Sequence, residues 1–169
     1  QWAAVEHRGE AAWPRVCSCS GALDLFLQKK GAFYQNKSHW SAEPMAHIVP
    51  HWNFKGLEGK EIPVTVYTNC DTLELFLNGE SCGKKAIEPY GHGEWEVPYA
   101  PGELRVMGFL AGQAVCEDVR VTTGRPVRLR LHLDNEFEAN GRDLALFTCD
   151  CLDAQGRSVP DAAPFVRFS

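Results

Sequence analysis

Apolar and polar positions follow three different patterns along the 169-residue chain. Residues 1–46 show a mixed pattern, in which Phe33 and Trp40 belong to a candidate helix that Pro44 would end. Residues 47–123 alternate in short runs separated by turn residues, as strands do when one face of a sheet is buried. Alternation resumes in residues 124–169. The pattern therefore predicts a mainly β chain with one helix near its beginning.

Two tight turns give the clearest local signal. Asn78-Gly79 lies between two strand-like runs, and these residue types tolerate the positive φ angles of a two-residue type I′ turn. Ala111-Gly112 separates a second pair of runs. Roughly six or seven short strands result, and this spacing predicts an antiparallel, immunoglobulin-like β-sandwich over residues 47–123.

The last part is predicted to be an incomplete second sandwich. Strands are expected at 127–133, 144–152 and 165–168, with a turn at 153–156. An immunoglobulin-like domain needs about 100 residues and seven strands. Residues 124–169 are too few for that, so we expect a truncated module.

Charge and cysteine content narrow the class of protein. The chain has 22 acidic and 17 basic residues, and no basic stripe carries interleaved aromatics, which argues against a nucleic-acid partner. No apolar run approaches the roughly 18 residues that cross a bilayer, so no membrane partner is expected. Gln1 is neither an initiator methionine nor part of a signal peptide, so the chain is expected to be cut at its front.

Seven cysteines are an odd number and are read as reduced thiols of a cytoplasmic bacterial protein. The two Cys-x-Cys pairs lack zinc spacing and a second pair of ligands. His47 and His51 are four apart, but Pro50 excludes the regular helix that would pair them, so they are read as structural histidines. We therefore expect no metal and no other cofactor.

Several segments resemble the family 2 glycoside hydrolases of the β-galactosidase kind. Residues 2–10, Trp-Ala-Ala-Val-Glu-His-Arg-Gly-Glu, are similar to the Trp-x-Gly-Phe-Asp-Tyr-Arg-Gly-Glu segment that follows the last barrel strand there. Residues 47–79 resemble the opening of the family's post-barrel sandwich. Residues 141–169 resemble the first half of a bacterial immunoglobulin-like module.

The resemblance covers nearly the whole chain and implies three parts. They are the last strand and helix of a (β/α)8 barrel (1–46), an immunoglobulin-like β-sandwich (47–123) and an incomplete bacterial immunoglobulin-like domain (124–169). It implies that the parent protein takes a carbohydrate substrate, hydrolysing terminal β-glycosides by a retaining mechanism with two carboxyl groups. Both carboxyl groups are implied to precede Gln1, so this fragment is expected to have no catalytic residue and to be inactive.

Trp2 is the one residue that the resemblance carries over as substrate-binding, as an indole platform for the sugar at the end of a barrel strand. Glu6 and Glu10 are a tempting carboxylate pair, but we expect both to be solvated loop acids without a catalytic role.

Two other functions remain open. In a non-catalytic carbohydrate-binding module, exposed rings such as Trp52, Tyr90, Trp95 or Tyr99 would stack on sugar, whereas a structural interaction domain would bury them. For Trp95 and Tyr99 core packing is the stronger interpretation, because they alternate with Val97 on one face. The sequence also leaves homo-oligomerisation open.

Overall fold

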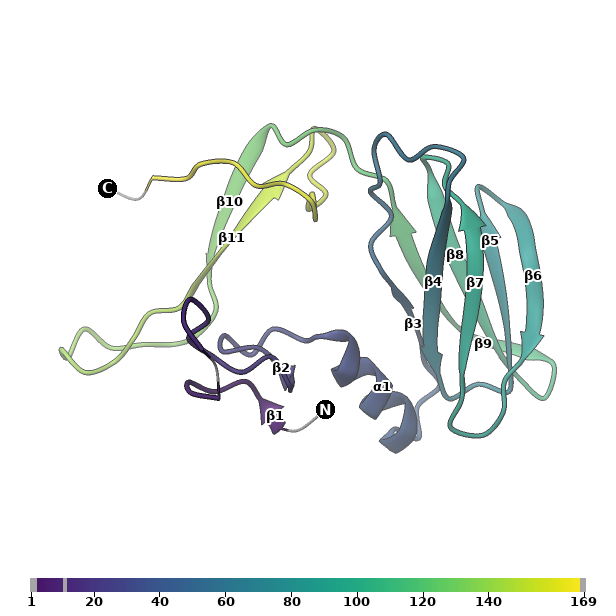
Figure 1. Ribbon diagram of the computed structural model, residues 1–169, viewed down its shortest axis with the longest axis horizontal. Coiled ribbons are helices and arrows are strands. Elements are labelled where there is room, and N and C mark those ends of the chain that lie inside the picture. The colour runs from purple at the N-terminus through teal and green to yellow at the C-terminus, as the bar shows by residue number, and fades with distance from the viewer. Residues whose placement is uncertain (1–2, 11, 168–169) are drawn as a thin grey trace. The chain divides into compact units, whose positions relative to one another are not determined.

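The computed structural model describes residues 3–10 and 12–167, and within these residues it contains one helix and eleven strands (Figure 1). The chain forms two compact units, Gln1–Val121 and Thr122–Ser169. The prediction of a mainly β chain with antiparallel sheets is confirmed. We describe the two units separately.

The first unit begins with a short β–α segment. Strand β1 (Ala3–Val5) pairs in parallel with β2 (Gly21–Leu23). Helix α1 (Gly31–Trp40) follows, at the place that the sequence predicts. Its last turn ends where the Ser41 N–H donates to the Lys37 carbonyl at 2.9 Å, three residues ahead of Pro44.

The rest of the first unit is a β-sandwich of seven strands. They are β3 (Ala46–Val49), β4 (Glu61–Thr68), β5 (Thr72–Leu77), β6 (Glu80–Ala86), β7 (His92–Pro98), β8 (Glu103–Leu110) and β9 (Gln113–Val121). One sheet has the order β3-β4-β7 and the other β6-β5-β8-β9, and every pairing in both is antiparallel. The immunoglobulin-like sandwich is therefore present, with a three-stranded sheet facing a four-stranded one, and Figure 1 shows the two layers.

Both predicted turns form as two-residue hairpins. Asn78 and Gly79 have φ angles of 51° and 86°, and Ala111 and Gly112 have 48° and 81°. The Asn78 side chain also accepts a hydrogen bond from the Glu103 N–H at 2.8 Å. The first turn therefore joins β5 to β6 and is also held against β8.

The inward-facing residues of the two sheets make the core. Strand β4 alternates strictly between buried and less buried positions over most of its length, and β7 and β8 do the same. Trp52, which lies between β3 and β4, is 1% exposed and donates its indole N–H to the Ala100 carbonyl at 3.0 Å. Its ring packs edge-on against Tyr99 at 5.2 Å. The loop that carries Trp52 therefore closes one end of the core.

A polar cluster connects the open edges of the two sheets, β3 and β9. The Asp118 carboxylate accepts a hydrogen bond from the Ile48 N–H at 2.8 Å, and the Arg120 guanidinium donates to the Ile48 carbonyl at 2.9 Å. Arg120 also pairs with Asp118 at 2.8 Å and lies 3.2 Å from the Nδ1 of His47. The His47 ring stacks on Tyr34 of α1, with 3.3 Å between centroids. His47 is thus structural, as the sequence predicts.

We expect this cluster to make stability depend on pH. Burial, with the Arg120 guanidinium and a smaller effect of Lys37, outweighs Asp118 and lowers the pKa of His47 from 6.5 to about 4. Between pH 6.5 and about 4, His47 is therefore protonated in the unfolded chain but neutral in the folded chain. The free energy of unfolding is thus highest above pH 6.5 and falls as the pH decreases towards 4. Urea midpoints at pH 7.5, 6 and 5 should show this loss.

The His47→Asn variant keeps an acceptor near Arg120 and removes the titrating ring. We expect its midpoint to fall less than that of the wild type between pH 7.5 and 5. His92→Asn, at a side chain 40% exposed on β7, is the matched control and should follow the wild-type profile. Equal slopes for the wild type and His47→Asn would contradict the assignment.

The connection between α1 and β3 is held in place by Asn69. Its side-chain amide donates to the carbonyls of Ser41 and Glu43, at 3.0 and 2.8 Å, and its oxygen accepts from the Met45 N–H at 2.8 Å. Thr68 adds a hydrogen bond from its hydroxyl to the Met45 carbonyl at 2.7 Å. The helix is therefore fixed on the sandwich by hydrogen bonds as well as by ring stacking.

The second unit contains one antiparallel hairpin. Strands β10 (Arg128–Leu133) and β11 (Phe147–Leu152) pair in register, and the turn predicted after β11 is present. The Asp153 carboxylate, fully buried, accepts hydrogen bonds from the Gly124, Gln155 and Arg157 N–H groups and from the Arg157 guanidinium. Burial acts to raise the pKa of Asp153, but these donors outweigh it and hold that pKa well below its usual range.

Two details of this unit differ from the sequence predictions. The strand expected at 144–152 begins only at Phe147, and no strand forms in residues 165–167, the described part of the run expected at 165–168. Alternation reports which face a residue would take, but a strand also needs a hydrogen-bonding neighbour. One face of the hairpin is open, since its leucines Leu129, Leu131 and Leu133 are 44–54% exposed.

Candidate functional site

The first 45 residues form the most distinctive part of the chain, because their strands are parallel. Ala3 pairs with Gly21 and Val5 with Leu23, and the Glu6 N–H continues the ladder by donating to the Leu23 carbonyl at 2.9 Å. Parallel strands occur mainly in α/β proteins, where helices cover them. Here the chain turns after β2 and enters α1, which packs beside it.

Gly21 is required by this pairing. A Cβ at position 21 would lie 2.4 Å from the Glu6 nitrogen, 2.6 Å from the Leu23 oxygen and 2.8 Å from the Val5 carbonyl carbon. All three are backbone atoms, which cannot move away as a flexible side chain can. The close approach of the segment around Glu6 to the first residue of β2 therefore depends on a residue without a side chain.

An ion pair lies directly after β1. The Glu6 carboxylate contacts the Lys30 ammonium, and Lys30 also donates to the Cys19 carbonyl at 3.0 Å. The Glu6 side chain is only 12% exposed, so the expectation of a solvated loop acid is wrong for this residue. The reason is tertiary: Lys30, 24 positions away, folds back onto β1. Glu10 is solvated as expected, with a side chain 57% exposed beside His7.

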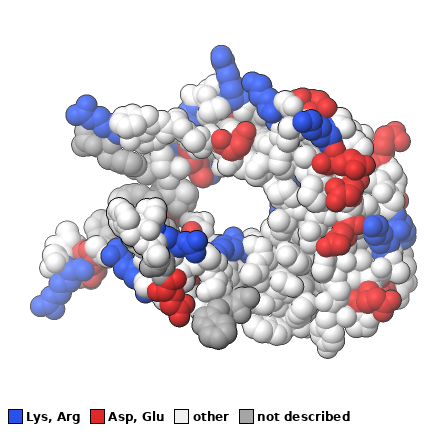
Figure 2. All heavy atoms as spheres, viewed as in Figure 1, with Lys and Arg blue, Asp and Glu red and all other residues white. Residues whose placement is uncertain are grey.

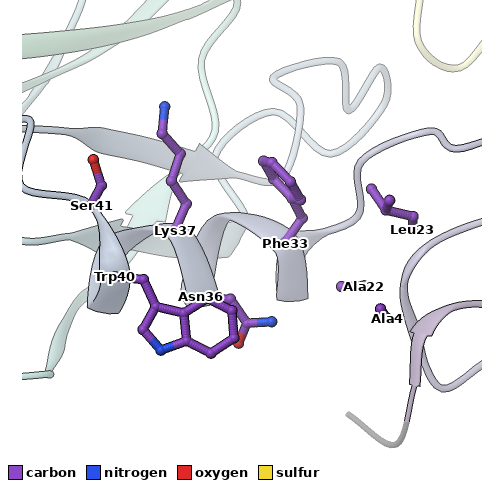
Figure 3. A pocket seen from close by; sticks show the side chains of 8 residues that line it. All are labelled: Ala4, Ala22, Leu23, Phe33, Asn36, Lys37, Trp40 and Ser41. Atoms are coloured by element: carbon purple, nitrogen blue, oxygen red, sulfur yellow. The ribbon is translucent and has the colours of Figure 1, made fainter.

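A largely apolar pocket of about 460 Å³ opens between β1, β2 and α1 (Figure 3). Its walls are formed by Ala4, Ala22, Leu23, Phe33, Asn36, Lys37, Trp40 and Ser41. Phe33, Asn36, Lys37 and Trp40 are spaced along one side of the helix. The Trp40 ring is 81% exposed at the end of this row, so α1 shows an aromatic face to solvent.

Further apolar side chains near this segment are also exposed. Trp13, Phe26 and Leu27 have exposed fractions of 86%, 66% and 61%. Isolated exposed apolar residues are common, but several of them within one short segment that also carries an open apolar pocket indicate a surface that contacts another chain segment or a partner. The segment therefore has the character of a contact surface.

Trp2, the substrate-binding residue expected from the sequence, lies outside the described residues. Of the four rings that could have formed a sugar-binding row on the sandwich, Trp52, Trp95 and Tyr99 are buried, at 1%, 6% and 2% exposure. Tyr90 is exposed, at 78%. Burial of three of these rings removes the aromatic row and favours the structural role.

The outer surface offers little other chemistry. On the face shown in Figure 2, acidic and basic side chains are interspersed over the sandwich, and Arg105, for example, pairs with both Glu103 and Glu117. Among the described residues no group of three or more His, Cys, Asp or Glu side chains is placed to hold a metal ion. The only helix described, α1, is neither long nor apolar enough to span a membrane.

Comparisons with known proteins give consistent matches. Residues 59–116 match a family model described as a domain of unknown function (DUF4982). The chain is 34% identical to β-galactosidase BoGH2A of Bacteroides ovatus over 174 aligned positions, which cover 99% of this chain and 20% of that protein. It is also 34% identical to a putative β-glucuronidase of Formosa agariphila, covering 95% of this chain and 16% of that protein.

A solved structure shares the fold. The crystal structure of a glycosyl hydrolase family 2 member from Bacteroides cellulosilyticus superposes with a TM-score of 0.86 and is 31% identical, covering 92% of this chain and 25% of that one. The chain thus spans about a fifth of the length of the curated relatives it matches. Both the parallel segment and the sandwich must lie in the matched part, because the alignments extend over nearly all of the chain.

Two important residues of the site were not found from the sequence. Lys30 is one of two adjacent lysines before α1, and nothing local distinguishes it from Lys29. Gly21 stands in residues 20–24, which resemble a Gly-x-x-Asp loop of the family, but that resemblance does not indicate a close backbone approach. A glycine directly before a short apolar run is the signal that, in retrospect, could have indicated a close backbone approach.

Proposed function

Because this chain is a segment of the glycoside hydrolase family 2 type by sequence and by fold, we propose that it works as the part of a longer β-glycosidase that closes the catalytic barrel and supports it. The parent would hydrolyse terminal β-galactosides or related β-glycosides with retention of configuration. The observation that carries the proposal is the match of nearly the whole chain to about a fifth of a β-galactosidase.

The N-terminal segment supports this role. A barrel closes when its last parallel strand and helix pack against the first ones. The parallel pair of β1 and β2, the pocket against α1 and the exposed Trp40 are the features that such a closing segment would present. At about 25 cal/mol per Å², covering several hundred Å² of this surface would contribute several kcal/mol to the intact enzyme.

Within the proposal, Trp2 binds substrate and the two catalytic carboxyl groups come from the part of the parent that precedes this chain. Glu6 is engaged by Lys30, and Glu10 is open to solvent. A retaining enzyme needs one protonated and one ionised carboxyl group about 5–5.5 Å apart. We infer that Glu6 and Glu10 do not serve as this pair.

We expect the 169-residue chain by itself to hydrolyse neither nitrophenyl β-galactoside nor nitrophenyl β-glucuronide above the buffer rate. The reason is that one bound sugar platform cannot replace two positioned carboxyl groups. Assays at high protein concentration, with the Glu6→Gln and Glu10→Gln variants beside the wild type, provide the measurement. Hydrolysis that one of these variants abolishes would overturn the assignment.

The role in the parent is tested in the longer polypeptide encoded with this segment. That protein should hydrolyse a β-glycoside, and NMR of the first product should show the β-anomer. Trp2→Ala is expected to lower kcat/KM by about tenfold or more, since stacking on sugar is lost, while Tyr90→Ala, at a ring 78% exposed on the sandwich, serves as the control. A product of inverted configuration, or equal activities for the two variants, would contradict the proposal.

A further inference from the structure

Two cysteines that are far apart in the sequence meet inside the sandwich. Cys70 lies in the turn between β4 and β5, and Cys116 lies on β9, yet their sulphur atoms are 3.5 Å apart. Cys70 is 4% exposed and Cys116 is partly buried. Both thiols are free in this structure.

Gly108 makes the contact between the thiols possible. It pairs with Cys116 across strands β8 and β9, and a Cβ at position 108 would lie 2.6 Å from the Cys116 sulphur and 2.8 Å from the Cys70 sulphur. The two side chains thus meet in the space that a side chain at 108 would occupy. Any larger residue there would separate them.

The remaining cysteines lack an equivalent neighbour across the fold. Cys149 and Cys151 are alternate residues of one strand, β11, and Cys17 and Cys19 have the same spacing in a loop. Side chains two residues apart on an extended strand point to the same side of the strand. Their Cα atoms are nevertheless too far apart for a disulfide to close easily between them. Cys82 donates weakly to the Glu80 carbonyl beside it. The pair across the core is therefore singled out by its geometry.

We propose that Cys70 and Cys116 form a redox-sensitive cross-link, a disulfide that joins the edge strand β9 to the β4–β5 turn when the protein meets a two-electron oxidant. A disulfide needs sulphur atoms about 2.05 Å apart, so the thiols have to approach by about 1.5 Å. The two thiols together lose two protons and two electrons, and the oxidant diamide takes them up as its N=N bond becomes a hydrazine.

The environment makes this reaction slow at neutral pH. Burial, together with the neighbouring Cys70 thiol, raises the pKa of Cys116 to about 12. The thiolate is the form that reacts, so the cross-link should form faster at pH 9 than at pH 7. The two thiols would therefore stay reduced in a reducing compartment. They would form the cross-link only when the protein is exposed to an oxidant for a long time.

The cross-link is tested by treating the folded chain with diamide at pH 7 and pH 9 and mapping tryptic peptides without reduction. Lys84, Lys85 and Arg105 separate the two cysteines into different peptides. Cys82 shares the Cys70 peptide, so the map is made in the Cys82→Ser background. We expect one linked pair, Cys70 with Cys116, and a rise in the melting temperature of about 5–10 °C that dithiothreitol reverses.

Cys116→Ser should abolish both the linked peptide and the rise in melting temperature, and Cys149→Ser, the matched control, should leave both intact. If the Cys116→Ser variant fails to fold, the peptide map of the Cys82→Ser protein still shows whether Cys70 and Cys116 are linked. Two results would overturn the proposal. In the first, Cys70 and Cys116 remain free thiols after other cysteines have reacted. In the second, one of them is linked instead to Cys17, Cys19, Cys149 or Cys151. Links only between separate chains would overturn it as well.

Discussion

Replacing Trp52 by alanine is expected to lower the free energy of unfolding of the sandwich by about 3–5 kcal/mol, the usual cost of removing a large buried ring. Trp52 is 1% exposed, packs against Phe54 and Tyr99, and donates its indole N–H to the Ala100 carbonyl. The substitution leaves a cavity and an unpaired carbonyl. Urea unfolding followed by circular dichroism measures the loss.

Tyr90→Ala is the matched control for this prediction. The Tyr90 ring is 78% exposed, and φ at this position is 64°, a strained backbone that tyrosine and alanine share. We expect a change of less than about 0.5 kcal/mol. If the two variants lost similar amounts of stability, Trp52 would not be the core residue that the structure places at the end of the sandwich. Stacking of Trp52 on a sugar would then have to be considered again.

Gly21→Ala is expected to have the largest effect on the N-terminal segment. The new methyl group would meet three backbone atoms at 2.4–2.8 Å, and overpacking of this kind costs about 1–3 kcal/mol or more. Because β1 and β2 are three residues each, their pairing cannot absorb that cost. Hydrogen exchange should therefore show faster exchange of the Glu6 N–H, while the sandwich amides keep their protection.

Gly31→Ala provides the comparison for Gly21→Ala. Gly31 is the first residue of α1, and a Cβ there would meet only the Tyr67 ring edge, at an ordinary 3.7 Å. Alanine also favours helix more than glycine does. Gly31→Ala should leave the exchange of the Glu6 N–H unchanged or slower. Equal loss of protection in both variants would show that the close approach at Gly21 does not control the pairing.

The sequence was most informative where structure depends on local chemistry. The Asn78-Gly79 turn follows from two residue types that accept positive φ, and the alternation of β4 follows from burial of one face. These signals identify the sandwich because each is complete within about ten residues. The helix from Gly31 to Trp40 was found in the same way.

Contacts between distant residues could not be predicted in this way. Asp118 accepts a hydrogen bond from Ile48, 70 residues away, and the sequence around it shows only an acidic residue on a strand. The burial of Glu6 depends similarly on Lys30. Strands of three residues, such as β1, are too short to show alternation, so their parallel pairing left no periodic signal.

The attachment of α1 through Asn69 bears on the construction of hybrid enzymes. A junction placed at residues 41–45 would separate Asn69 from the carbonyls of Ser41 and Glu43 and from the Met45 N–H. The connection from the foreign helix would then have to place the same two carbonyl groups and the same N–H group around the Asn69 side chain. A junction at the end of the compact unit Gln1–Val121 keeps these three hydrogen bonds within one piece, and it is the better place to exchange one enzyme's modules for another's.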